Sequence, residues 1–202
     1  MNILVIDTET STTSFENGPD GHIVEIGIAK VDLERRIVSP LFSSPVLDLS
    51  ADPSAWCFEN STLDPEDVWR GIPTGMLSPI LITMVGHYEV TSYNIDFDRS
   101  MIQRDLPILA ETIRWGRCLM EICADIPGIP RIGKRGSYPK AVDAYNYLCP
   151  DDPADIGGKE EHRALSDAIM EGHILLSLYG KGLYDPLPDE YLLLKEDGQW
   201  GQ

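Results

Sequence analysis

The chain has 202 residues, 43% of them hydrophobic and 24% charged, which suits one globular domain with a substantial core. Its net charge of −17 argues against a broad basic face that binds long nucleic acids, because such binding depends on neutralising phosphates. No apolar run approaches the roughly 20 residues of a membrane span and no signal peptide is evident, so we expect a cytoplasmic protein without membrane contact. The four cysteines lack metal-ligand spacing and are expected to be reduced thiols.

The first quarter of the chain predicts a meander of strands, which we expect to be antiparallel. Three runs are rich in apolar and β-branched residues, at residues 2–6, 22–32 and 36–46. Pro40 and Pro45 lie in the third run, and this run suits an edge of the sheet because proline cannot donate a hydrogen bond to a neighbouring strand. Ser, Thr, Asn, Gly and Pro dominate residues 11–21, which predicts a loop between the first two strands.

The rest of the chain predicts helices around a further strand. Residues 48–75 look irregular, except that the acidic residues 64–67 are typical of the first turn of a short helix. A strand is expected at residues 89–93 and a loop at residues 151–158. Longer helices are expected at residues 76–87, 97–105, 117–125, 138–148 and 164–179, the last of which has the clearest apolar periodicity.

Strands that are followed by helices interleaved with a strand indicate an α/β layered domain. We place this domain at residues 1–180. Residues 181–202 then form a C-terminal tail punctuated by prolines, which is expected either to pack as an extension or to dock a partner protein.

Two acidic residues follow the first apolar run. Asp7 and Glu9 are two residues apart on a predicted strand, so both side chains should point to the same side. Adjacent carboxylates repel each other and need counter-charge to stay ionised, and such hard oxygen ligands suit Mg²⁺ or Mn²⁺. The alternative is a solvated strand end, although an aspartate directly after five core-type residues is oddly placed for a surface acid.

A second candidate lies near the start of the helix predicted at residues 97–105. Asp98 closes the phrase Asn94-Ile95-Asp96-Phe97-Asp98. Aspartate is common in the first turn of a helix, and Asp96 competes for the same role, so the residues alone leave the assignment open. Asn94 is placed to orient a metal ligand or the backbone of a substrate.

The last predicted helix supplies the third part of the pattern. Asp167 lies among apolar residues, where a carboxylate needs compensation that a metal ion supplies. His162 precedes this helix, and a neutral imidazole beside a metal site is a good general base near neutral pH. A lone histidine is more often structural or solvated, and we give this plain interpretation to His22, His87 and His173.

Together these phrases resemble the DnaQ-like, or DEDDh, family of 3′–5′ exonucleases, whose fold is ribonuclease-H-like. The resemblance covers roughly residues 1–179, and within the family it is greatest to exodeoxyribonuclease X and to proofreading exonucleases of the polymerase III epsilon type. The segments that carry it are Asp7-Thr8-Glu9-Thr10, His22-Ile23-Val24-Glu25-Ile26-Gly27, Asn94-Ile95-Asp96-Phe97-Asp98 and His162-Arg163-Ala164-Leu165-Ser166-Asp167.

The resemblance implies a fold and a catalytic apparatus. The expected sheet is mixed, an antiparallel opening meander continued by parallel strands, and helices flank it. The family's Asn-x-x-Phe-Asp spacing selects Asp98 over Asp96. Two Mg²⁺ ions, for which Mn²⁺ should substitute, would be held by Asp7, Glu9, Asp98 and Asp167, with His162 as the general base.

The resemblance is weaker where the substrate would bind. Ser11 stands where the family often has glycine, and Tyr93 stands where it often has histidine. Arg131 and Lys140 delimit the only dense basic stretch, which suggests either a phosphate-contacting loop or a solvated turn. The residues expected to contact the substrate are Thr8, Thr10, Phe58, Leu63, Asn94, Lys134, Arg135 and Tyr138.

The function implied is removal of nucleoside 5′-monophosphates from the 3′ end of DNA, with single strands favoured. An exoribonuclease acting on short RNA or RNA 3′ ends is the alternative, because the catalytic residues do not distinguish the two sugars. A non-catalytic binding module on the same fold is a remote third reading. Nucleic acid is the expected partner, together with a polymerase or repair protein.

Overall fold

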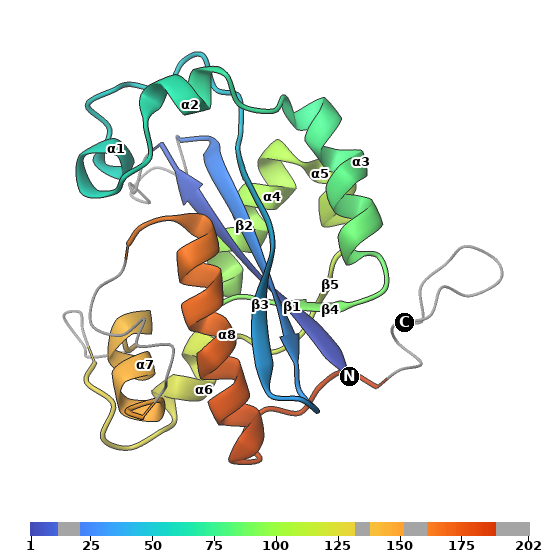
Figure 1. The fold of residues 1–202 in the computed structure, drawn as a ribbon, viewed down its shortest axis with the longest axis vertical. Coiled ribbons are helices and arrows are strands. Elements are labelled where there is room, and N and C mark those ends of the chain that lie inside the picture. Colours follow the sequence, from blue (N-terminus) through green and yellow to red (C-terminus); the bar gives the residue numbers. More distant parts are fainter. Residues whose placement is uncertain (12–20, 132–137, 152–160, 189–202) are drawn as a thin grey trace, which may run out of the picture.

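The computed structural model describes residues 1–11, 21–131, 138–151 and 161–188, in which a five-stranded sheet is flanked by helices (Figure 1). The strands lie in the order β3-β2-β1-β4-β5. Their bounds are β1 (Asn2–Thr10), β2 (Ile23–Asp32), β3 (Ile37–Pro45), β4 (Glu89–Thr91) and β5 (Arg114–Trp115).

The pairing of the strands confirms the predicted mixed sheet. β1 is antiparallel to β2, and β2 is antiparallel to β3, so the opening meander is as expected. β1 is parallel to β4, and β4 is parallel to β5. β3 lies at the edge, as its prolines predicted, and its register with β2 shifts beside Pro40. The first strand extends to Thr10 rather than ending at residue 6, so Asp7 and Glu9 lie inside β1.

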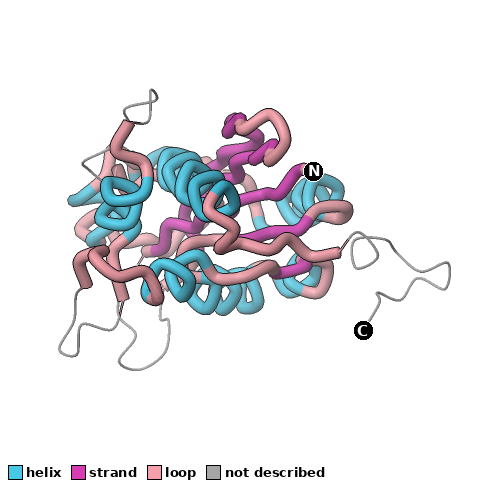
Figure 2. Tube along the Cα trace, turned by 90° about the horizontal axis from the view of Figure 1, so that it is seen from below, coloured by secondary structure: helices cyan, strands magenta, loops and turns pink. Residues whose placement is uncertain are grey.

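Helices cover both faces of the sheet, as Figure 2 shows. Three short elements were not predicted, namely α1, α5 and β5, and α1 lies in the segment expected to be irregular. The longer helices agree with the predictions to within a few residues at their ends. The helices are α1 (Trp56–Asn60), α2 (Pro65–Trp69), α3 (Thr74–Val85), α4 (Ile95–Asp105), α5 (Pro107–Ala110), α6 (Leu119–Ala124), α7 (Ala141–Leu148) and α8 (Ala164–Gly180).

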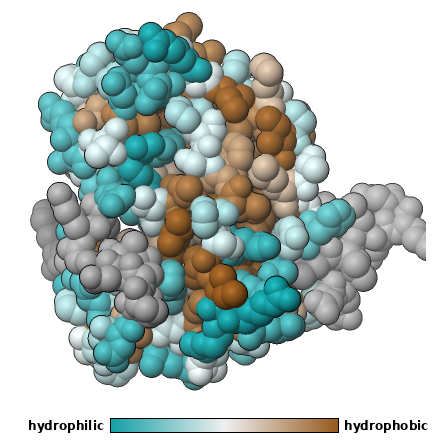
Figure 3. Space-filling model, in the orientation of Figure 1, coloured by the Kyte–Doolittle hydropathy of each residue, from teal (hydrophilic) through white to brown (hydrophobic). Residues whose placement is uncertain are grey.

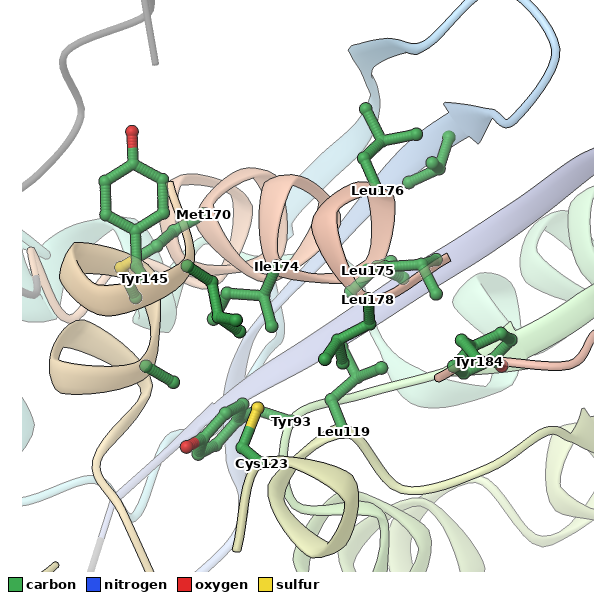
Figure 4. Packing of buried hydrophobic residues seen from close by; sticks show 14 of the residues in the cluster. Tyr93, Leu119, Cys123, Tyr145, Met170, Ile174, Leu175, Leu176, Leu178 and Tyr184 are labelled. Atoms are coloured by element: carbon green, nitrogen blue, oxygen red, sulfur yellow. The ribbon is translucent and has the colours of Figure 1, made fainter. Parts of the chain in front are cut away.

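Alternation along β1 divides the core into two layers. Ile3 and Val5 pack with residues of α6, α7 and α8, and Figure 4 shows the helical side of this cluster. Leu4 and Ile6 point the other way and pack with residues of α3, α4 and α5. Since side chains alternate along a strand, Asp7 and Glu9 continue the row of Val5 toward α8.

The chain after α8 packs against the parallel side of the sheet. The Tyr184 side chain is buried and its hydroxyl donates a hydrogen bond to Glu89 Oε1 over 2.5 Å. The Leu187 backbone N–H donates to Glu89 Oε2 over 2.7 Å, and Arg117 donates to the Leu183 carbonyl oxygen. Residues 183–187 are therefore tied to β4 and to the segment after β5. The domain boundary placed at residue 180 stays a prediction.

Three further features bear on the predictions. All four cysteines are free thiols. In the described part of the chain, no helix combines the length and apolar character needed to cross a bilayer. The surface in Figure 3 is hydrophilic over α2 and hydrophobic over α3, where Met76 and Ile80 are exposed.

The N-terminus of α8 lies directly against β2 because residue 27 is glycine. A Cβ atom added to Gly27 would lie 2.2 Å from the Ala164 carbonyl carbon and 2.2 Å from the Leu165 nitrogen. Both are backbone atoms, so no side-chain rotation relieves the clash. The position of the first turn of α8 therefore depends on this glycine.

We expect Gly27→Ala to lower the free energy of unfolding by about 1–3 kcal/mol, because the added methyl must displace the start of α8. Chemical denaturation followed by circular dichroism measures this. Gly75→Ala is the control, since an added Cβ there meets nothing within 4 Å. Equal stability of the Gly27→Ala protein and the wild type would contradict the packing described.

Candidate active site

The candidate site lies where the end of β1 meets the start of α8. Glu9 from β1, Asp167 from the first turn of α8 and His162 just before this helix each offer a ligand atom, and these atoms lie within 4.8 Å of one another. The two segments are more than 150 residues apart in the chain, so the fold alone brings them together. Asp7, two residues before Glu9, lies in the same row of side chains.

Asp98 joins this group from the opposite layer. It lies in the first turn of α4 and only 3% of its surface is exposed. Its Oδ1 accepts hydrogen bonds from the Thr8 backbone nitrogen over 3.1 Å and from the Thr8 hydroxyl over 2.9 Å. Asp96 is exposed and forms an ion pair with Arg99, whereas the charge of Asp98 acts on both Asp7 and Glu9.

The electrostatics show four carboxyls close enough for their charges to interact, of which Asp98 is buried and Asp7, Glu9 and Asp167 are half-buried. Burial, together with the charges of Glu171 and Asp98, raises the pKa of Asp7 well above its ordinary value. Burial and then Asp167 raise the pKa of Glu9 to about 8. Burial raises the pKa of Asp98 to about 7 despite the opposing hydrogen bonds from Thr8. Such shifts mean that the protein atoms supply too little positive charge, which divalent cations would provide.

A fifth carboxylate lies next to the site and was not predicted from the sequence. Glu171 is on α8, one helical turn after Asp167, and is 4% exposed. Its Oε2 accepts a hydrogen bond from the Tyr93 backbone nitrogen over 3.0 Å, just before the start of α4. The four-residue spacing from Asp167 on an apolar helix was the signal available in the sequence.

The start of α8 is held by an ion pair with β2, in which the Glu25 side chain is buried and that of Arg163 is partly exposed. Arg163 Nη2 lies 2.6 Å from Glu25 Oε1, and Arg163 Nε donates to both carboxylate oxygens of Glu25. Glu25 Oε2 also accepts from the Ala164 backbone nitrogen over 3.0 Å, which satisfies one of the free N–H groups at the helix start. Glu25 and Gly27 belong to the second matching segment of the sequence, and the structure gives both a role in seating α8.

His162 itself has a left-handed backbone, with φ of 52°. Few residues other than glycine adopt this conformation, and those that do are often at functional sites. His162 precedes Arg163, whose backbone is extended and whose side chain is held by Glu25. The residue directly after His162 is therefore held in place.

The residues expected to contact a substrate lie in different settings. Thr8 and Thr10 are buried on the α4 side of β1, and Leu63 is buried in a small cluster beneath α1 and α2. Phe58 is half-buried against the same cluster, and Asn94 is half-buried at the start of α4. Tyr138 is 46% exposed, while Lys134 and Arg135 lie outside the described residues.

We expect the metal-free protein to lose stability as pH rises from about 5 to 9. Asp98 and Glu9 have ordinary pKa values of 3.8 and 4.5 and folded values of about 7 and about 8, so across this range the folded state binds more protons than the unfolded chain. Thermal denaturation in a chelator should therefore show a falling midpoint. Adding a divalent cation should raise the midpoint more at pH 9 than at pH 5.

The double variant Glu9→Gln, Asp98→Asn is the control, and its metal-free midpoint should depend much less on pH. A wild-type midpoint that rises through this pH window would show that the carboxyls do not share a buried site.

Comparison with known proteins gives structural likeness only. No family model matches the chain, and no curated protein sequence matches it. The chain superposes on a 3′-exonuclease described as specifically recognising the histone mRNA stem-loop, with a TM-score of 0.65 and 16% identity over 91% of this chain and 83% of that one. The nuclease domain of 3′hExo, described as a DEDDh family member bound to rAMP, gives a TM-score of 0.63 and 14% identity over 93% and 96%.

E. coli exonuclease I in complex with a dA16 oligonucleotide is a third such structure. It gives a TM-score of 0.61 and 13% identity over 90% of this chain and 42% of that one. At these identities the likeness shows the fold. The chain therefore has the predicted ribonuclease-H-like architecture, a mixed sheet flanked by helices.

Proposed function

We propose that this protein is a metal-dependent 3′–5′ exonuclease that removes nucleoside 5′-monophosphates from DNA. The observation that carries the proposal is the meeting of Glu9, Asp167 and His162 at the end of β1, with Asp7 and Asp98 close enough to interact with these carboxylates. The same fold in solved exonucleases supports it, although a fold alone does not determine activity.

We propose that this donor set binds two Mg²⁺ ions, with Mn²⁺ able to substitute. Asp7, Glu9, Asp98 and Asp167 would hold them, because carboxylate oxygens are preferred ligands of these ions. The pKa values of Asp7, Glu9 and Asp98 are raised because their charged forms are disfavoured, and bound cations would favour those charged forms. When bound, such ions acidify water and stabilise negative charge on a leaving oxygen.

The protein side of the reaction follows from the geometry. His162 would accept the proton of the attacking water, since its ring nitrogen lies among the carboxylate oxygens of Glu9 and Asp167. Asp98, fixed by two hydrogen bonds from Thr8, would hold its ligand oxygen in place while charge moves. The bond between phosphorus and the 3′ oxygen of the penultimate nucleotide would then break. The 3′ oxygen would stay on the shortened strand, and the terminal nucleotide would be released as a 5′-monophosphate.

The preference for DNA, and for single strands, is part of the proposal. It is supported by the sequence resemblance to exodeoxyribonuclease X and proofreading exonucleases, while the net charge of −17 favours short or unpaired substrates. Phe58, Asn94 and Tyr138 are proposed to contact the substrate, together with Lys134 and Arg135 as phosphate ligands. Thr8, Thr10 and Leu63 are buried, and we propose that they support the side chains that contact the substrate.

We also propose a cytoplasmic location and a polymerase or repair protein as a partner. The partner would bind through residues beyond 188, because residues 183–187 are already engaged with Glu89 and Arg117.

Asp7→Ala should lower turnover by about 10³-fold or more, because a ligand that stabilises transition-state charge contributes several kcal/mol. His162→Ala should lower it by about 10²–10⁴-fold, the usual contribution of a general base. The measurement is shortening of a 5′-labelled oligonucleotide in Mg²⁺. Asp96→Ala is the matched control, an exposed aspartate on the same helix as Asp98, and should retain wild-type turnover.

Single-stranded DNA and RNA of the same sequence separate the two enzymatic readings. We expect a ladder that shortens from the 3′ end on DNA and a several-fold slower one on RNA. Faster cleavage of RNA would identify an exoribonuclease, because discrimination depends on contacts to the 2′ position. No cleavage of either, with metal binding intact, would leave a binding module.

A further inference from the structure

An exposed tryptophan lies against the proposed general base. Trp56 is on α1 and 41% of its surface is exposed. The centroids of its ring and the His162 ring are 4.7 Å apart, and the ring planes are inclined at 73°. This is the edge-to-face arrangement that aromatic pairs prefer, so the contact restrains the imidazole.

The helix that carries Trp56 is itself anchored. Cys57, the next residue, is buried, and it packs with Val24 of β2, Val68 of α2 and Leu63. Trp56 therefore stands on a small core built on the same strand that seats α8. An aromatic ring on such a support keeps its position relative to the sheet.

A second link joins this segment to the residue after His162. The Thr62 hydroxyl accepts a hydrogen bond from Arg163 Nη1 over 3.1 Å, while Arg163 Nε and Nη2 hold Glu25. The segment 56–62 thus contacts the His162 ring at one end and the Arg163 side chain at the other. These two contacts restrain the ring of His162 and the side chain of the residue that follows it.

We propose that Trp56 is a positioning residue that keeps a ring nitrogen of His162 at the carboxylates of Glu9 and Asp167. This inference rests on the proposed function, since it concerns the same site. The His162 backbone is left-handed and lies two residues before the start of α8, and its ring lies beside the half-exposed carboxylates of Glu9 and Asp167. The indole limits rotation of this ring without contacting the reacting atoms.

The first test compares kinetic constants of the full chain on a single-stranded oligonucleotide in Mg²⁺. Trp56→Ala should lower kcat about 10-fold and leave KM within about twofold, because a misplaced base slows chemistry without weakening binding. Trp56→Phe keeps an aromatic edge and should restore most of kcat. Trp69→Ala, which removes an exposed tryptophan of α2, should behave as wild type.

The second test asks whether Trp56 acts through His162. In a His162→Gln background, Trp56→Ala should slow turnover no further, because the group being positioned is already gone. An additional 10-fold loss in the double variant would overturn the proposal. A raised KM at unchanged kcat in Trp56→Ala would also overturn it, since the indole would then contact the substrate.

A third measurement does not depend on activity. The His162 ring proton signal, identified among the four histidines by its loss in His162→Gln, should be shifted by the indole ring current and should move in Trp56→Ala. If the wild type turns over substrate but the His162 signal does not move in Trp56→Ala, the positioning role is wrong and the exonuclease proposal stands. A shift in a wild-type chain that lacks metal-dependent turnover would overturn the exonuclease proposal while confirming the ring contact.

Discussion

The seating of α8 on β2 is the constraint on which the candidate site depends. Glu25 accepts hydrogen bonds from both Arg163 and the first backbone N–H of the helix, and Gly27 removes the side chain that would hold the helix away. An ion pair that is buried on one side costs desolvation, which here is offset by several hydrogen bonds to one carboxylate. A side chain at residue 27 would push the first turn of α8 away from β2 and so move Asp167 away from Glu9.

The clustered acids of the candidate site destabilise the folded state when no cation is bound. Burial raises the pKa values of Asp7, Glu9 and Asp98, and neighbouring carboxylates raise those of Asp7 and Glu9 further, so their charged forms are disfavoured without a cation. Folding must therefore hold together a cluster that its own charges oppose, and the two apolar layers on either side of β1 provide the cohesion. Under the proposed function, binding of a cation at this cluster would therefore also stabilise the fold.

Local patterns in the sequence identified what depends on local geometry. Asp7 and Glu9 were found because strand alternation fixes their common side, and Asp167 because a carboxylate on an apolar helix needs a partner. The contact of Glu25 with Arg163 spans 138 residues, and that of Trp56 with His162 more than 100, so no periodicity reveals them. The helices α1 and α5 and the strand β5 have five, four and two residues, which is too short for a repeating apolar pattern.

The hydrogen bonds of Tyr184 and Leu187 to Glu89 also determine where another polypeptide can be attached to this domain. Since α8 has 17 residues and rises about 1.5 Å per residue, its two ends are separated by about 25 Å. The chain turns back onto β4 at the end of α8 remote from His162. A polypeptide tethered to the segment after Pro188 would thus be attached at the end of the domain remote from the carboxylate cluster.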